Sequence, residues 1–349
     1  MIDAPDIHAR QKAALGPFRA ALDMGDAAAI RAALEALIAP DAVLHLCHPF
    51  GDVQGPGAFY DAALGPLRKA LPDLERRDWI VMAGHDGDGA AWVGCGGHYM
   101  GTFAAPYCGI PPTGHLAHLR FHEFYRFAAG RVVEMQLLWD LPELMMQAGV
   151  WPMAPSLGRD LCVPGPASCD GLSPAPRDAG ASARNCYLVQ DMLAHMIHHP
   201  AQGGPEVMEM ARFWHPKMTW YGPAGIGTAR GIAGFRAWHQ KPFLEAMPDR
   251  GQNPDGLDAH FFADNAYVAV TGWPNMRQTI TGDGWLGIAP AGQEVTLRSL
   301  DFWRIEGDRI RENWVLIDLL DLFRQLGVDV LARMRALAAA RGGLAGEAP

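Results

Sequence analysis

The chain contains an internal repeat. With an offset of 178 residues and no gap, residues 119–150 match residues 297–328 at thirteen of 32 positions, where chance would give roughly two matches. Further upstream the offset becomes 176, with the matches Pro40/Pro216, Gly55/Gly231 and Phe59/Phe235. A repeat this long indicates a duplicated domain, and the change of offset indicates a loop that differs by two residues. The chain is therefore predicted to form the same domain twice.

Composition places the boundaries of the two copies. A chain of 349 residues is long enough for two domains of ordinary size. A segment rich in Pro, Gly, Ser and Ala separates the copies, and such a segment cannot bury a core of its own. The prediction is a first domain over 1–153, a linker over 154–183, a second domain over 184–335 and a flexible tail over 336–349.

Both copies show the same order of expected elements. Helical segments come first (about 8–38 and 184–213), followed by a short β segment and a helix that begins at glycine. Three alternating β segments and a final strand follow, and the turns "AAGR" and "EGDR" join the last two strands as hairpins. Helices followed by an antiparallel run of strands predict the α+β class.

Charge and motif content argue against several kinds of function. A formal charge of −9, from 38 acidic and 29 basic residues, does not suit a nucleic-acid surface. No apolar run approaches the roughly 18 residues of a membrane span, and the first residues lack the pattern of a secretory signal. Six cysteines form no CxxC pair, which favours free thiols in a reducing cytoplasm. No nucleophile elbow or phosphate-binding glycine loop is present.

Two aspartates stand at the same point of the repeat, Asp140 and Asp318. Strand alternation places Asp140 on the same face as Glu134, Gln136 and Leu138, and Asp318 on the equivalent face of the second copy. Each aspartate also precedes a helix, and Asp is a strong N-cap. A structural role as a cap and a chemical role as a buried acid or base are both compatible with this position.

The last strand and helix carry a recognisable motif in both copies. The first copy reads "GRVVE…WD…QAG" and the second "GDRIRE…ID…QLG", and "GGHYMGTF" and "PPTGH" precede the motif in the first copy only. This pattern resembles the SnoaL-like polyketide cyclase family of the nuclear-transport-factor-2-like superfamily. The resemblance implies two cone-shaped α+β domains, each with a curved antiparallel sheet wrapped around helices. It also implies pairing of the sheets as an internal pseudo-dimer, and an additional homodimer is compatible with it.

The resemblance further implies an activity. Asp140 and Asp318 would act as acid or base beside a carbonyl, in an aldol-type ring closure or an isomerisation. An apolar cavity with one carboxylate suits such proton transfer, because desolvation raises the carboxyl pKa and strengthens hydrogen bonds to the enolate oxygen. The expected partner is a small apolar substrate with a carbonyl group, without a cofactor. The alternative is a module on the same fold that binds small molecules or assembles with partners without turnover.

Several further residues are candidates for the pocket. His98, in "GGHYMGTF", is a candidate catalytic donor, although a lone sheet histidine is more often a structural residue. No metal is predicted, because His118 and His122 on one strand would stand roughly 13 Å apart. The predicted substrate-binding residues are His118, His122, Gln136, Trp139, Trp273 and Trp314.

The two copies differ in ways that favour the first as the catalytic one. The second copy has Met276 where the first has His98. It also contains Trp273, Trp285 and Trp314, each large enough to occupy a pocket. The sequence thus favours the first domain as the working one, and Asp318 of the second domain remains either a catalytic residue or only the N-cap of its helix.

Overall fold

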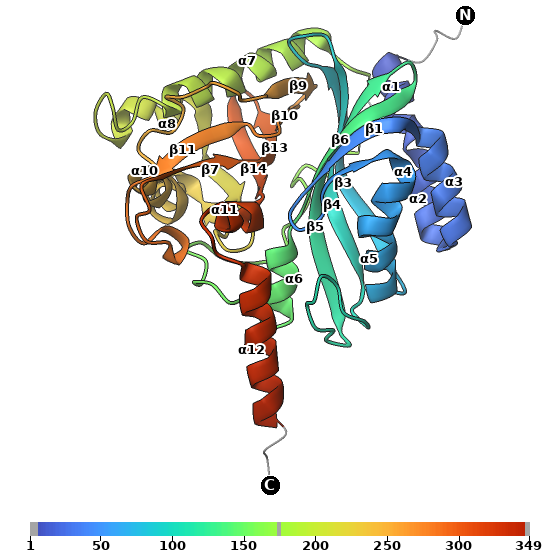
Figure 1. Ribbon diagram of the computed structural model, residues 1–349. Helices are drawn as coiled ribbons and strands as arrows, with labels where there is room; N and C mark the ends of the chain where they lie inside the picture. The colour runs from blue at the N-terminus through green and yellow to red at the C-terminus, as the bar shows by residue number, and fades with distance from the viewer. Residues whose placement is uncertain (1–5, 173–175, 346–349) are drawn as a thin grey trace, which may run out of the picture.

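The computed structural model describes residues 6–172 and 176–345. It contains two domains, each built on a six-stranded sheet (Figure 1). The strand orders are β2-β1-β6-β5-β4-β3 and β8-β7-β14-β13-β10-β9, so the two sheets have the same topology. Neighbouring strands are antiparallel except for the pairs β1–β6 and β7–β14, which are parallel. The predicted duplicated α+β fold is confirmed.

The first domain starts with three helices and continues with the sheet. Its elements are α1 (Ile7–Ala14), α2 (Gly16–Met24), α3 (Ala27–Leu37), β1 (Ile38–Leu46), β2 (Gly51–Gln54), α4 (Gly55–Phe59), the π-helix η1 (Tyr60–Leu64), α5 (Gly65–Ala70), β3 (Glu75–His85), β4 (Ala91–Thr102), β5 (Leu116–Ala128), β6 (Arg131–Trp139) and α6 (Leu141–Gln147).

The second domain repeats this order with shorter strands. Its elements are α7 (Ala179–Met196), η2 (Pro205–Met208), α8 (Met210–Phe213), β7 (Trp214–Tyr221), β8 (Ala229–Arg230), α9 (Gly231–Phe235), the π-helix η3 (Arg236–Gln240), α10 (Lys241–Ala246), β9 (His260–Asp264), β10 (Tyr267–Thr271), β11 (Met276–Ile280), η4 (Trp285–Gly287), β12 (Gln293–Leu297), β13 (Ser299–Glu306), β14 (Arg309–Ile317), α11 (Leu319–Gln325) and α12 (Val330–Ala345).

The helix that covers each sheet is bent at the same place in both copies. Pro66 and Pro242 lack the N–H that an α-helix needs, and a π-helical turn precedes each of them. The helix begins at a glycine with positive φ, Gly55 or Gly231. A Cβ at Gly55 would lie 2.5 Å from the carbonyl oxygen of Pro40, so only glycine fits there.

The two sheets pack against each other with the faces that the helices leave uncovered. Phe124 and Phe302, which are equivalent in the repeat, stack in the middle of this seam with ring centroids 5.0 Å apart. Gly94 makes room for them, because a Cβ there would lie 2.9 Å from the Phe302 ring. The packing is the predicted internal pseudo-dimer.

The segment between the domains is held along the seam. Trp314 Nε1 donates to the Pro164 carbonyl at 2.9 Å, and Val81 N donates to the Gly171 carbonyl at 2.9 Å. Arg159 forms a β-bridge with Thr228. Over 154–172 and 176–178 the Pro- and Gly-rich linker has no helix or long strand, yet it is anchored at both domains. Helix α7 begins at Ala179, inside the predicted linker.

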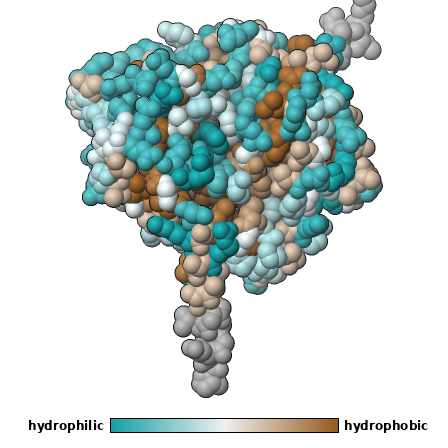
Figure 2. Space-filling model, in the orientation of Figure 1, coloured by the Kyte–Doolittle hydropathy of each residue, from teal (hydrophilic) through white to brown (hydrophobic). Residues whose placement is uncertain are grey.

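The end of the described chain differs from the predicted flexible tail. Helix α12 continues to Ala345 and leaves the body of the molecule (Figure 1), because Ala, Leu and Arg are strong helix formers. The last four residues of the predicted tail lie outside the described part. None of the described helices has the length and apolarity that crossing a membrane requires. Hydrophilic residues cover most of the face in Figure 2, with apolar residues between them.

Candidate functional site

Asp140 lies in the seam between the domains rather than under the helices of its own domain. It caps α6, because its side chain accepts from Glu143 N at 3.3 Å. Its other oxygen accepts from Ala224 N of the second domain at 2.9 Å and lies 3.2 Å from Arg120 Nη2. Burial raises the pKa of Asp140 to about 7, although Arg120 opposes this shift.

Asp318 has the equivalent contacts. It caps α11 through Asp321 N at 3.1 Å and accepts from His48 N of the first domain at 2.9 Å, with Arg298 Nη1 at 3.4 Å. Burial raises its pKa to about 6. Each aspartate therefore joins its own helix, its own arginine and the backbone of the other domain.

The alternation predicted for these aspartates places them on the face that the seam covers. Gln136, on the same face as Asp140, bonds across the seam to the hydroxyl of Thr271. His122 is buried there, with Nδ1 2.6 Å from the carbonyl oxygen of Leu300. Trp314 stacks on Tyr221 at 5.4 Å. Gln136, His122 and Trp314, three of the six predicted substrate-binding residues, are thus part of the contact between the sheets.

The other predicted residues are spread over different parts of the molecule. Trp273 stacks on His45 at the edge of the seam. Trp139 points into the core of the first domain, where its Nε1 donates to Glu123 at 3.0 Å. The predicted residues do not meet in one pocket, except for a group around Asp140.

That group lines a cavity of about 260 Å³ at the seam, which we call the seam cavity. Its lining includes Asp140, His118 and Glu143 of the first domain, Cys162 of the linker, and Gly222, Ala224, Gly227 and Thr228 of the second domain. His118 Nδ1 lies 3.1 Å from Glu143 Oε1. Burial lowers the pKa of His118, but hydrogen bonds to Cys162 and Glu143 outweigh it and raise the pKa to about 10. Ligand atoms of His98, His118 and Cys162 lie within 4.8 Å of one another.

The space between sheet and helices, which we call the cone, is filled in the first domain. Its only central carboxylate among the described residues is Glu123, which the sequence interpretation did not single out. Glu123 accepts from Tyr99 at 3.0 Å, Trp139 at 3.0 Å, Tyr125 at 2.5 Å and Arg76 at 2.5 Å. Its hydrogen-bonding capacity is satisfied by these four donors, and the rings of Tyr99, Phe121 and Trp139 pack against one another beside it. Glu123 therefore has no free position for a ligand.

The cone of the second domain is hollow. An inner chamber of about 70 Å³ and an outer chamber of about 170 Å³ share Asp301, Ser299, Trp303, Arg250, Met276 and Leu193 in their walls. Asp301 is the equivalent of Glu123. Its carboxylate accepts from Ser299 Oγ at 2.5 Å, and burial raises its pKa to about 7. Asp301 is half-buried by accessible area, because part of its surface faces the chambers.

The difference between the cones follows from the residues that point inward. Four inward-pointing side chains of β5 and β6 have smaller counterparts at the equivalent positions of β13 and β14. The changes are Phe121 to Ser299, Met135 to Asn313, Leu137 to Val315 and Trp139 to Ile317. The tryptophans that were expected to fill the second copy do not line the inner chamber, because Trp273 and Trp314 lie in the seam and Trp285 packs beside Phe243.

The inner chamber is lined by polar atoms without partners. Within residues 6–172 and 176–345, no hydrogen-bond partner is found for Trp214 Nε1, Trp303 Nε1, His239 Nδ1, Gln240 Oε1 and Arg250 Nη1. Burial also lowers the pKa of His239 to about 3, so its ring is neutral. Buried polar groups are normally hydrogen-bonded, and a ligand in the chamber would supply the missing partners.

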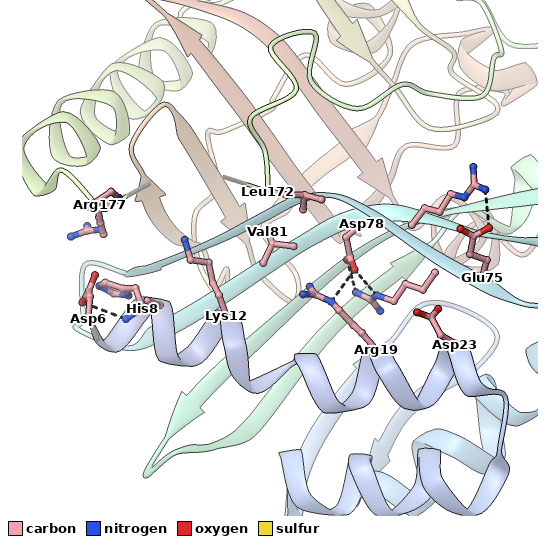
Figure 3. A pocket seen from close by; sticks show the side chains of 14 residues that line it. Asp6, His8, Lys12, Arg19, Asp23, Glu75, Asp78, Val81, Leu172 and Arg177 are labelled. Carbon is pink, nitrogen blue, oxygen red and sulfur yellow. Dashed lines mark hydrogen bonds and ion pairs between the residues drawn. The ribbon is translucent and has the colours of Figure 1, made fainter. Parts of the chain in front are cut away.

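A larger hollow lies elsewhere in the described part of the chain, a groove of about 790 Å³ between α1, α2 and β3 (Figure 3). Several of its charges are paired within the protein: Asp78 lies 2.9 Å from Arg19 and 3.0 Å from Arg76, and Glu75 lies 2.8 Å from Arg77. His8 Nδ1, which also lines the groove, has no hydrogen-bond partner among the described residues. The cone of the second domain, where five unpartnered polar atoms surround one carboxylate, is the better candidate.

Comparisons with known proteins agree with this fold. The family model of SnoaL-like polyketide cyclases matches residues 15–148 and 204–326, which is most of the chain. The chain belongs to this family, and it carries the family's domain twice. No curated protein matches it.

Solved structures resemble one copy at a time. AclR from Streptomyces galilaeus, a candidate hydroxylase, is 24% identical with a TM-score of 0.34, over 41% of this chain and 86% of that one. IdmH from Streptomyces antibioticus, a candidate polyketide cyclase, is 23% identical with a TM-score of 0.33, over 40% and 98%. An NTF2-like protein from Burkholderia xenovorans is 18% identical with a TM-score of 0.32, over 41% and 96%.

Proposed function

We propose that the chain is an acid–base enzyme whose working site is the cone of the second domain. Asp301 would take a proton from a carbon beside a carbonyl group, and the enolate would then close a ring or be reprotonated at another carbon. The observation that carries the proposal is a single carboxylate with a pKa of about 7 in a cavity lined by aromatic residues and unpartnered donors. A base with this pKa is half ionised near neutral pH and remains basic enough to accept a proton.

The donors around the chamber suit the oxygen of an enolate. The indole N–H groups of Trp214 and Trp303 lack partners, and both side chains are almost fully buried. The fixed N–H dipoles of these two indoles would stabilise a negative oxygen in the chamber, and no water would have to reorganise. Arg250, whose pKa burial lowers, adds a positive charge on the wall that both chambers share.

The volumes restrict the substrate to a small molecule. An apolar cavity of about 150 Å³ holds one benzene ring, and the outer chamber is of similar size at about 170 Å³. We therefore propose a carbonyl compound of about one ring, whose reacting end enters the inner chamber. No described group in this chamber points to a cofactor.

The proposal is tested by proton exchange. Small β-keto esters and cyclic ketones are incubated with the protein in D₂O, and deuterium at the carbon beside the carbonyl is followed by NMR. Asp301→Asn should remove the exchange, because the amide keeps the shape but accepts no proton. An unchanged rate in a folded Asp301→Asn protein would contradict the proposal.

The seam cavity supports a second candidate site with Asp140 as acid or base. The observation in its favour is that Asp140 lines this cavity with a pKa of about 7. Against it, both carboxylate oxygens of Asp140 already accept hydrogen bonds from the protein. Loss of exchange in Asp140→Asn, with full activity in Asp301→Asn, would move the site to the seam.

A further inference from the structure

Three side chains that are common ligands of soft metal ions lie close together at the seam, and two of them, His118 and Cys162, line the seam cavity. His98 comes from β4, His118 from β5 and Cys162 from the linker, and their ligand atoms lie within 4.8 Å of one another. His98 and His118 stand on neighbouring strands, since His98 pairs with Arg120 and Met100 pairs with His118. Diagonal neighbours of this kind can reach each other. His118 and His122 stand too far apart along one strand to share an ion, whereas His98 and His118 lie beside each other on two neighbouring strands.

His98 offers a buried nitrogen that nothing else uses. Its side chain is almost fully buried, at 5% exposure, and Nδ1 accepts from Trp79 Nε1 at 3.3 Å. Nε2 has no hydrogen-bond partner among the described residues. The ring lies edge to face with His118, with centroids 5.6 Å apart. A buried imidazole nitrogen without a partner costs free energy, which a bound ion would recover.

A carboxylate holds the second histidine in place. Glu143 Oε1 lies 3.1 Å from His118 Nδ1, while its Oε2 accepts from Arg120 N at 2.7 Å. Metal-binding histidines usually pair their second nitrogen with a carboxylate or carbonyl, which orients the ring. His118 also forms a hydrogen bond with Cys162, so an ion bound between these two side chains would replace that hydrogen bond.

We propose that His98, His118 and Cys162 bind one divalent ion of the Zn²⁺ type at the seam, with a fourth position open to the seam cavity. Two imidazoles and a thiolate suit Zn²⁺ or Co²⁺ and are poor ligands for Mg²⁺ or Ca²⁺. Three protein ligands and an open position are typical of zinc sites that bind water or a substrate. The inference is independent of the proposed role of Asp301.

Binding requires two local movements. Zinc–ligand bonds are roughly 2.0–2.3 Å long, and Cys162, which is exposed in the linker, can adjust its position to reach the ion. The Trp79 hydrogen bond indicates that Nε2 of His98 carries the ring hydrogen. An ion on Nε2 would shift that hydrogen to Nδ1 and release the Trp79 indole.

The second domain cannot form the same site. The positions of His98 and His118 are Met276 and Thr296 there, and the linker that supplies Cys162 occurs once. The expected stoichiometry is one ion per chain.

Titration with Co²⁺ tests the site directly. Tag-free, reduced protein is titrated with Co²⁺ without oxygen, and thiolate-to-cobalt charge transfer is recorded in the near ultraviolet. The expected result is a band that saturates at one Co²⁺ per chain and disappears when Zn²⁺ is added. Cys162→Ser should lose the band, and His98→Gln should weaken binding at least tenfold. Glu143→Gln should weaken it by about 10–100-fold.

The linker provides a matched control in Cys169, which is also free and exposed. Cys169→Ser should leave the band and the stoichiometry unchanged. Thermal unfolding of each variant shows that the domains remain folded. Absence of a saturable band in the native protein, or its persistence in Cys162→Ser, would overturn the proposal. A second group of histidines, His195, His198 and His199, lies at the C-terminal end of α7. Binding that depends on this group instead would overturn the proposal as well.

Discussion

At the scale of single residues, buried carboxylates have different tasks. Asp140 and Asp318 each accept a backbone N–H from the other domain, so they are part of the framework. Glu123 and Asp301 stand at equivalent points inside the cones, but only Asp301 borders a cavity. The aspartate motif could be recognised from the sequence, because it recurs with its helix. The importance of Asp301 could have been found by comparing inward positions of the two copies.

Replacement of the framework aspartate should cost stability. Asp318→Ala removes the cap of α11 and the bond from His48 N. The free energy of unfolding should fall by about 1–3 kcal/mol, measured by urea denaturation at pH 7. Asp308→Ala, which changes a fully exposed aspartate of the second domain, is the control and should change little. An equal stability of Asp318→Ala and the native protein would show that the seam does not need this bond.

Replacement of Asp301 should instead stabilise the fold at high pH. Its folded-state pKa of about 7 lies above the ordinary value of 3.8, so ionisation opposes folding. The native protein should lose stability as the pH rises from about 4 to about 7, and the loss should be complete above that range. Asp301→Asn should lose the part of this dependence that comes from Asp301, while Asp140 and Asp318, whose pKa values are also raised, keep theirs. The variant should therefore be more stable than the native protein at pH 8 by about 2–4 kcal/mol. Unfolding curves at pH 4 and pH 8 check the prediction. It fails if the free energies of unfolding of the native protein and Asp301→Asn differ by the same amount at both pH values.

At the scale of elements, the sheets were predictable and their surroundings were not. Alternation along β6 placed Gln136 and Asp140 on one face, and the structure agrees. Strand alternation shows which residues share a face of the sheet. It does not show whether helices or the other domain cover that face, because this depends on packing over the whole chain. For the same reason Trp314 was expected in a pocket and lies in the seam.

The hollow in the second cone should depend on the small inward residues of β13 and β14. Ile317→Trp restores the residue of the first copy and should fill the inner chamber. Turnover should fall at least tenfold, while a stability change of about 1–3 kcal/mol is expected from overpacking. Leu316→Met, at the neighbouring position that faces away from the chamber, is the control. Full activity of a folded Ile317→Trp protein would show that substrate does not use this chamber.

At the scale of the whole molecule, the domains form one structural unit. The sheets pack face to face around Phe124 and Phe302, and the linker is bonded to both of them. The duplication was evident from the sequence because the repeat has almost no gaps. The order of the linker was not evident, since its Pro- and Gly-rich composition is also typical of unstructured spacers.

This unit should unfold in a single transition. Phe302→Ala leaves a cavity in the seam and should cost about 3–5 kcal/mol, which affects both domains together. Calorimetry should show one peak for the native protein and one peak at a lower temperature for the variant. Two separate peaks, of which only one moves in the variant, would show that the domains are independent.

The assignment of the site to the second cone is tested most directly by one comparison of deuterium exchange. Asp301→Asn and Glu123→Gln change equivalent carboxylates in the two cones, and Asp140→Asn changes the seam. With a substrate that the native protein deuterates, Asp301→Asn should lose the exchange, whereas folded Glu123→Gln and Asp140→Asn should retain most of it. In the native protein the rate should rise with pH and level off above about pH 7, where Asp301 is ionised. Retention of exchange in Asp301→Asn, with its loss in Glu123→Gln or Asp140→Asn, would contradict a site in the second cone.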